Sequence, residues 1–393
     1  MKHWIWLHPD WLAQEGPRFV WRADALADAL RAAQYRQGQL LGKAQGAGPA
    51  LSAEFSLDAM LQNIVQSSAI EGEVLNVGSV RSSLARRLGL DAPARGEARS
   101  EGLAQIMFDA TGNLAEPLTL QRLLQWHQWL FADVPELMAL RLHVGDWRGD
   151  ETMQVVSGRI DKPTIHFEAP PRDVLDIELA RFVVWFNASH GTLDPLLRAA
   201  IAHFWLVTLH PFEDGNGRIT RALTDLALAQ GEGQSVRFYA MSAAIQAQRK
   251  QYYDQLETHQ SIAPDVPLDL TGWLAWFLAT LTQAMDDALG KIDRVLGKSH
   301  FWLRYRDTQL LPEQRKVLNR LLDGDTDERG GFEQGISASQ YQKVAKVSKA
   351  TATRHLADLL AKGCLYQLPG GGRSTRYQIN LDGAPGVVSK EQA

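Results

Sequence analysis

The stretch from His210 to Arg221 reads His-Pro-Phe-Glu-Asp-Gly-Asn-Gly-Arg-Ile-Thr-Arg, and it separates two helical runs. The run before it, Ala199–Leu209, must end near Pro211, because proline has no backbone N–H to donate. Gly215-Asn216-Gly217 permits the positive φ angles of a tight turn, and a second helical run extends from Arg218 to Ala229. The stretch therefore predicts a helix, a tight glycine loop and a second helix.

The residues of this loop are suited to phosphate. The N–H groups in the first turn of a helix have no partner within the helix, so they attract anions. Arg218 and Arg221 are three residues apart on one helical face, where both can clamp phosphate oxygens. Asp214 offers the oxygen ligand that Mg²⁺ takes when phosphates already carry it. His210 can accept a proton near neutral pH, so the stretch predicts a site for phosphate-ester chemistry.

The pattern is specific. The stretch does not fit G-x-G-x-x-G, because Thr220 stands in place of the last glycine. Elsewhere in the chain, Gly297-Lys298-Ser299 resembles the end of a Walker A loop, but Ile292 stands where the first glycine of that loop is needed. A capping loop between two helices is the plain alternative. The stretch does match H-x-F-x-[DE]-G-N-G-R-x-x-R at every fixed position, so the protein resembles the Fic family of nucleotidyl transferases.

The resemblance implies a role for each position of the motif. His210 would deprotonate a Ser, Thr or Tyr hydroxyl that attacks the α-phosphate of ATP, and Asp214 would hold Mg²⁺. The rest of the turn would bind the nucleotide: Gly215, Asn216, Gly217, Arg218, Ile219, Thr220 and Arg221. Within that set, Arg218 would contact the β-phosphate and Arg221 the γ-phosphate.

Composition limits the class of protein. A chain of 393 residues is expected to hold two or three domains, and its net charge of −4 does not favour polyanion binding by the whole chain. Its one cysteine, Cys364, leaves no internal disulfide, which fits a reducing cytoplasm. The most apolar window, Leu270–Met285, is shorter than the ~20 residues that span a membrane, so we expect a cytoplasmic protein without a membrane partner.

The first 50 residues predict a separate region. Aromatic residues are concentrated in residues 3–21, where Trp4 and Trp6 alternate and Phe19-Val20-Trp21 follows a Pro- and Gly-containing segment. This pattern predicts a small hairpin, followed by a helix over residues 24–42. The tryptophans favour packing against a neighbouring helix, with a ligand-stacking surface as the alternative.

The core is predicted over residues 51–300 and begins with a candidate inhibitory helix, residues 56–72. Its end carries Ser67, Glu71 and Gly72, which match the [ST]-x-x-x-E-[GN] motif of many Fic proteins. A glutamate near a helix C-terminus opposes the helix dipole and needs a cationic partner. The resemblance implies that this partner is Arg221, so that Glu71 occupies the place of the γ-phosphate. A helix that simply ends at a capping glycine is the alternative.

Residues 144–171 break the helical pattern. Two β-capable runs, residues 155–158 and 164–167, predict a hairpin in a mostly helical chain. In Fic proteins a flap lies at this place, and its exposed edge would bind an extended segment of the target protein. A hairpin without function is the alternative.

The segment after the motif carries further candidates. Fic sequences often have Ile-x-x-Asn-Arg-x-x-Tyr-Tyr within the helix predicted here over residues 241–259, and Gln248 and Tyr252 occupy the positions that contact the nucleoside. Gln248 departs from the usual Asn, and packing alone also explains the tyrosine. His203 is interpreted as a hydrogen-bonded core residue. The apolar run 268–295 would close the core or form the interface of a homodimer.

Residues 309–380 predict a winged helix-turn-helix, followed by a loose tail over residues 381–393. Helices are expected over 312–322, 337–344 and 348–362, then a hairpin from runs 364–368 and 375–379. Basic residues exceed acidic ones here, which suits double-stranded DNA with Arg373 and Arg376 on phosphates. A protein-interaction or dimer module is the alternative.

Together these patterns predict a mainly α fold with a Fic helical core and a β-hairpin flap. The expected function is Mg²⁺-dependent transfer of AMP from ATP to a protein hydroxyl, with release of pyrophosphate and inhibition by Glu71. Removal of AMP by the same site is compatible with the resemblance. The alternative is a DNA-binding transcriptional regulator that uses its Fic core as a nucleotide sensor.

Overall fold

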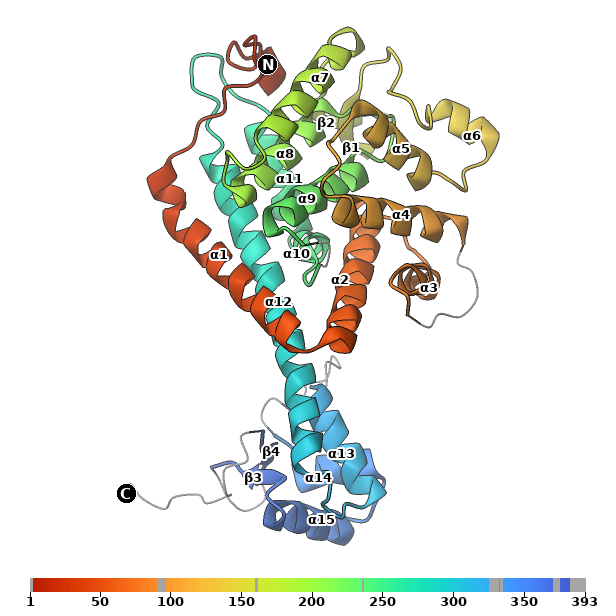
Figure 1. The fold of residues 1–393 in the computed structure, drawn as a ribbon, viewed down its shortest axis with the longest axis vertical. Helices are drawn as coiled ribbons and strands as arrows, with labels where there is room; N and C mark the ends of the chain where they lie inside the picture. The colour runs from red at the N-terminus through yellow and green to blue at the C-terminus, as the bar shows by residue number, and fades with distance from the viewer. Residues whose placement is uncertain are drawn as a thin grey trace. The chain divides into compact units, whose positions relative to one another are not determined.

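The computed structural model describes residues 3–90, 97–159, 162–234, 237–324, 332, 335–369 and 375–381. The described chain is mainly helical, as predicted, and its strands form two short hairpins (Figure 1). It divides into two compact units, Met1–Ala288 and Leu289–Ala393. Among the described residues, no helix is long and apolar enough to cross a membrane.

The prediction of an N-terminal hairpin is wrong. Ile5–Leu7 form a single 3-10 turn, η1, while Trp4 and Val20 make isolated bridges to Ser261 and Asp269 instead of pairing with each other. Burial of the aromatic rings directs this segment, since Trp11 and Phe19 both pack edge-on against Trp205. The predicted helix follows as α1, Ala23–Gly46.

The first half of the core is a series of helices. They are α2 (Pro49–Ile70), α3 (Val77–Arg87), α4 (Ala98–Gly112), α5 (Leu120–Leu130) and α6 (Glu136–Arg141). Pro49 suits the first turn of α2, which needs no backbone donor there. Asn76 and Thr119 cap α3 and α5 by accepting hydrogen bonds from Ser79 N and Arg122 N. The candidate inhibitory helix is thus longer than predicted at its start.

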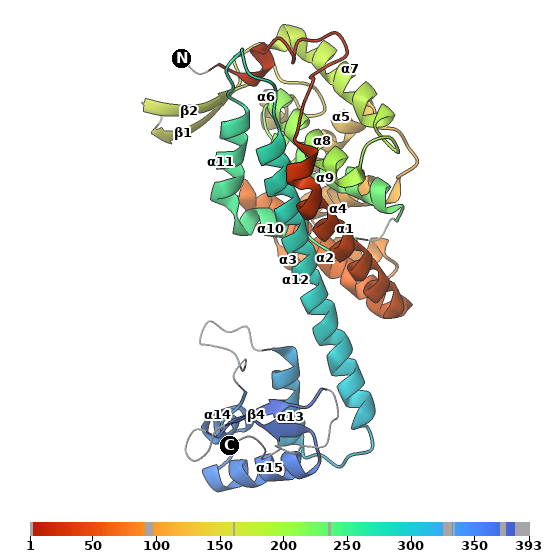
Figure 2. The same ribbon diagram turned by 90° about the vertical axis from the view of Figure 1, so that its left-hand side faces the viewer.

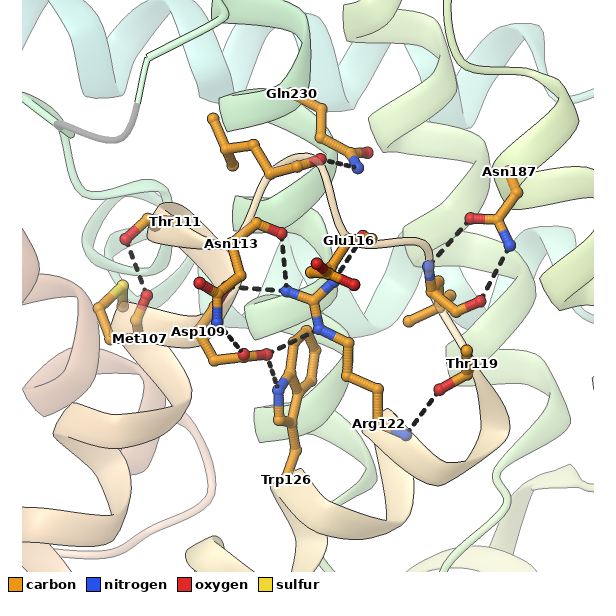
Figure 3. A network of polar contacts seen from close by, with 12 residues as sticks. Met107, Asp109, Thr111, Asn113, Glu116, Thr119, Arg122, Trp126, Asn187 and Gln230 are labelled. Carbon is orange, nitrogen blue, oxygen red and sulfur yellow. Dashed lines mark hydrogen bonds and ion pairs between the residues drawn. The ribbon is translucent and has the colours of Figure 1, made fainter.

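A polar network fixes the turn between α4 and α5 (Figure 3). Arg122 donates to Asp109 Oδ2 at 2.7 Å and to the carbonyl oxygens of Asp109, Asn113 and Glu116. Trp126 donates its indole N–H to the same Asp109 carboxylate at 2.6 Å. Because α5 also carries His127, this network sets the position of one wall of the candidate site.

The predicted flap is confirmed as a hairpin. It consists of β1 (Gln154–Arg159) and β2 (Lys162–Glu168), with a register shift between Val155 and Val156. Figure 2 shows it extending beside α11. Helix α7 (Arg172–Ala188) follows the flap.

The two motif helices lie at the centre of the core. They are α8 (Pro195–Leu209) and α9 (Asn216–Glu232), and nearly every α8 side chain is buried because the run is apolar on all faces. The segment predicted as one helix over 241–259 is two, α10 (Met241–Ala247) and α11 (Arg249–His259), with the break at Gln248. Helix α12 (Thr271–Arg304) extends further than predicted.

The C-terminal unit has its own apolar core. Its elements are α13 (Pro312–Asp323), α14 (Ala338–Ala345), α15 (Lys349–Ala361), β3 (Leu365–Gln367) and β4 (Tyr377–Ile379). Leu318, Tyr341, Leu356 and Leu365 belong to one buried cluster. The expected wing loop with Arg373 and the tail over 382–393 lie outside the described residues. Recognition of DNA by this unit stays a prediction.

Candidate active site

The turn between α8 and α9 is held by left-handed backbone at both ends. His210, the C-cap of α8, has φ 50°, and Gly215, the N-cap of α9, has φ 85°. Asn216 closes the turn from inside, since its side chain accepts from Phe212 N at 2.9 Å and donates to Phe212 O at 2.7 Å. A β-carbon on Gly215 would lie 2.6 Å from Leu130, so both the φ angle and the space require glycine.

Arg148 is a residue at this site that the sequence did not single out. It is 1% exposed, and its Nε donates to the carbonyl of His210 at 2.9 Å. Its backbone N–H donates to Pro211 O at 3.0 Å, and its guanidinium also donates to Pro170 O beside the flap. One arginine thus joins the turn between α8 and α9 to the base of the hairpin.

The contacts of His210 fit a general base. Its Nδ1 lies 3.2 Å from the carbonyl oxygen of Val207, and a carbonyl only accepts, so Nδ1 carries the proton. This leaves the lone pair on Nε2. Burial lowers the pKa of His210, and the nearby charge of Arg148 lowers it further, although Glu71 and Asp214 act in the opposite direction. The imidazole is therefore neutral and able to take a proton at neutral pH.

His127 supports the turn from α5. Its ring stacks on Phe212 with 4.2 Å between centroids, its Nδ1 accepts from Gly145 N, and its Nε2 donates to Asp214 O. Burial lowers the pKa of His127 to about 4, which keeps both hydrogen bonds in place at neutral pH. Phe212 is fully buried, so its ring anchors the turn in the core.

The predicted pairing of Glu71 with Arg221 is present. Arg221 NH2 donates to Glu71 Oε1 at 2.7 Å and to Ser67 O at 2.9 Å, and its Nε donates to Ser67 Oγ at 2.8 Å. Gly72 follows with φ 81°, as a helix-ending glycine does. A β-carbon on Gly217 would lie 2.1 Å from Glu71 Oε1, so the carboxylate sits directly against the glycine turn.

Arg218, which with Arg221 forms the expected phosphate clamp, is also paired with a carboxylate, and the sequence did not indicate this pair. Arg218 donates to Glu73 Oε2 at 2.6 Å and lies 3.3 Å from Asp214 Oδ2. Arg99 of α4 holds the same Glu73 oxygen at 2.5 Å. Both clamp arginines are buried, and both contact carboxylates of the short segment that follows α2.

A cavity of about 560 Å³ opens beside the turn. Residues from four parts of the chain line it, among them Glu71, His210, Gly217, Val155 and Tyr252. The hydroxyl of Tyr252 donates to His203 Nε2 at 2.9 Å, and His203 Nδ1 donates to Thr224 at 2.9 Å. His203 is thus the hydrogen-bonded core residue that was expected, and burial lowers its pKa to about 3.

Other predicted nucleotide contacts lie away from this cavity. Gln248 is at the junction of α10 and α11, outside the cavity lining. Ile219 is 1% exposed and Thr220 is fully buried, so neither side chain reaches the cavity. They occupy the face of α9 that packs in the core, which the motif alone does not reveal. Their predicted contact with nucleotide stays a prediction.

Asp214 is suited to be a ligand of a Mg²⁺ ion that is already bound to the phosphates of a nucleotide. Its side chain is 52% exposed, and one of its oxygens accepts from Gly215 N at 2.5 Å. No group of three or more His, Cys, Asp or Glu that would hold a metal alone occurs in the part of the chain that the structure describes. A Mg²⁺ ion that takes most of its ligands from phosphates and water fits this single carboxylate.

Comparisons with known proteins agree with the motif. Residues 117–228 match the model of the Fic/DOC family, and residues 4–90 match a domain of unknown function, DUF4172. Protein adenylyltransferase Fic of Culex quinquefasciatus is 32% identical over 206 residues, which are 51% of this chain and 37% of that protein. Its counterpart in Drosophila melanogaster is 29% identical over 204 residues, with the same coverage.

A solved Fic family protein from Desulfovibrio desulfuricans G20 aligns with 93% of this chain and 97% of its own. The identity is 19% and the TM-score 0.48, a likeness too loose to bear on the site. The match to the curated relatives spans well under half of their length. Since the segment that fits the family model contains the whole turn from His210 to Arg221, residues 117–228 are a Fic/DOC domain of this chain.

Proposed function

We propose that this protein transfers AMP from ATP to a hydroxyl of a protein substrate and releases pyrophosphate. The observation that carries the proposal is His210, a neutral imidazole with a free Nε2 beside a glycine turn and two arginines. The relatives that share this segment are named protein adenylyltransferases. The whole match is about half of this chain, so the acceptor is a matter for experiment.

The chemistry follows from the positions of these groups. The hydroxyl oxygen of the substrate attacks the α-phosphorus, the bond to the β-phosphate bridge breaks, and His210 Nε2 takes the hydroxyl proton. The glycine turn and the start of α9 supply N–H groups for the phosphates, and Arg218 and Arg221 balance their charge. Asp214 would hold Mg²⁺, which supplies charge neutralisation on the phosphate oxygens when bound.

We further propose that the described form is the inhibited one. Arg221 contacts Glu71 and Arg218 contacts Glu73, so the cations needed by the phosphates are both occupied by carboxylates. ATP must displace these contacts or bind in a misaligned manner. The glutamate closest to the turn, Glu71, would also be able to orient water for removal of AMP.

The exposed edge of the flap is the proposed docking place for the substrate protein. Val155 and Val156 line the cavity from β1, and Val156 is 51% exposed. An extended segment of a target can pair with such an edge and bring its hydroxyl to His210.

The decisive experiment uses the Glu71→Gly form with and without His210→Ala. We expect Glu71→Gly protein to transfer label from α-labelled ATP to proteins of a cell lysate, and the double variant to lose about a hundredfold or more of that rate while it still binds ATP. ATP binding by calorimetry is the control. Equal transfer by both forms would remove His210 from the reaction and overturn the proposal.

A second function, DNA binding, is favoured by α15. This helix buries Ala352, Leu356 and Leu359 in the C-terminal unit and exposes Lys349 and Arg354. A helix with exposed basic residues suits the major groove of a duplex. The two functions are compatible in one chain, because the described core of each unit is separate.

A further inference from the structure

A serine, a histidine and a glutamate form a hydrogen-bonded chain outside the phosphate-binding turn. Ser157 Oγ lies 2.6 Å from His166 Nε2, and His166 Nδ1 lies 2.8 Å from Glu257 Oε2. Ser157 and His166 belong to the two strands of the flap, and Glu257 belongs to α11, beside which the flap extends (Figure 2). All three line the cavity that also contains His210.

The positions of the protons follow from the partners. A carboxylate only accepts, so His166 Nδ1 carries a proton and donates it to Glu257. The lone pair of His166 is then on Nε2, which accepts the hydroxyl proton of Ser157. A serine hydroxyl becomes a nucleophile when a base takes its proton and a third group orients that base. The three side chains have this order and these distances.

The flap backbone has a local irregularity that accompanies this arrangement. Val155 pairs with Phe167 and Val156 pairs with Ile165, so His166 is an extra residue in β2 without a partner opposite. Such bulges redirect a side chain and are frequent beside active sites. The side chains of His166 and Glu257 are 33% and 39% exposed, so a ligand in the cavity can reach this chain of groups.

We propose that Ser157 is an activated hydroxyl and the site at which this chain modifies itself. The inference rests on the proposed AMP transfer. Ser157 Oγ attacks the α-phosphorus of ATP, the bond from that phosphorus to the β-phosphate bridge breaks, and pyrophosphate leaves with the electron pair. The proton of Ser157 passes to His166 Nε2, and Glu257 stabilises the resulting imidazolium. The product is a phosphodiester between Ser157 and AMP.

The experiment measures self-modification of the full chain in the Glu71→Gly background. The protein is incubated with ATP and Mg²⁺, its intact mass is recorded, and the modified residue is located by peptide mapping. We expect one AMP group on Ser157, its loss in Ser157→Ala, and a rate about a hundredfold lower in His166→Gln. Thr164→Val is the matched control, because exposed Thr164 faces Ser157 across the hairpin.

Each outcome decides something different. AMP on another residue, unchanged in Ser157→Ala, overturns this inference and leaves AMP transfer intact. An unchanged rate in His166→Gln rejects the activating chain. If no residue gains AMP, self-modification is overturned, whereas transfer to other proteins is judged by the labelled lysate. A serine-directed fluorophosphonate probe then tests the hydroxyl without ATP. Labelling of Ser157 that depends on His166 would uphold the activated serine, and an unlabelled Ser157 would reject it.

Discussion

At the scale of single residues, the site depends on the conformation and charge state of His210. The left-handed backbone of this non-glycine residue is unfavourable by itself, and Arg148 stabilises it with hydrogen bonds to the carbonyls of His210 and Pro211. The same guanidinium lowers the pKa of His210. Arg148 therefore acts on both the position and the basicity of the imidazole.

Replacement of Arg148 separates these two effects. In Arg148→Gln the positive charge is lost, so the pKa of His210 rises and the acid limb of the pH–rate profile moves to higher pH. In Arg148→Lys the charge remains, so the limb stays in place while the rate falls because the forked hydrogen bonds are lost. The pH–rate profile of AMP transfer, measured in the Glu71→Gly background from about pH 5 to 9, where histidine titrates, distinguishes the two variants. Identical limbs in the two variants would contradict it.

The lowered pKa of His127 predicts that the folded chain loses stability as the pH falls. Its pKa is about 4 in the folded chain and lies below the ordinary value of 6.5, so the unfolded chain binds the proton more tightly. The stability that its neutral form contributes is present above pH 6.5 and is lost as the pH falls toward 4. Thermal unfolding should show a smaller loss between these values in His127→Gln than in the parent. An equal loss in both would reject the effect.

At the scale of elements, the segment that ends α2 controls both arginines of the clamp. Glu71 and Glu73 lie on one short stretch and contact Arg221 and Arg218 respectively. A single substitution therefore releases one arginine only. The affinity for ATP should therefore increase with each of the two carboxylates that is removed.

We expect Glu71→Gly/Glu73→Gln to bind ATP roughly tenfold more tightly than Glu71→Gly alone, within the usual range for coupled sites. Isothermal calorimetry gives the affinities without any need for transfer. Asp58→Asn, which breaks an exposed pair between Asp58 of α2 and Arg81 of α3, is the matched control and should leave affinity unchanged. Weaker binding in the double variant would instead assign Glu73 to the positioning of Arg218 for phosphate.

At the scale of the whole molecule, the chain combines a Fic core with a C-terminal unit that has its own apolar cluster. Lys349 and Arg354 are exposed on α15, where phosphates of a duplex would meet them. Each such contact contributes about one to the slope of log affinity against log salt.

If the unit binds DNA, Lys349→Ala/Arg354→Ala should lower that slope by about two in the full chain, measured by fluorescence anisotropy with a duplex pool. Lys298→Ala, a substitution outside α15, serves as the comparison. Absence of salt-dependent binding in the parent chain would favour the protein-interaction alternative for this unit.

The sequence by itself determined the features that depend on neighbouring residues. Pro211, Gly215 and Asn216 predicted the turn, because their effects on φ angles and on helix ends are local. The helices and the flap hairpin followed from periodicity in the same way. The resemblance added the pairing of Glu71 with Arg221, which the structure contains.

Only the tertiary structure decided which distant groups complete the site. Arg148 is 62 residues from His210, His127 is 87 from Asp214, and Glu73 is 145 from Arg218, so no local pattern links them. The aromatic residues of the N-terminal segment likewise suggested a hairpin, but Trp11 and Phe19 pack against Trp205 of α8 and Trp4 packs against Phe167 of the flap. Side-chain burial and long-range ion pairs depend on the packed chain, and a sequence pattern records neither.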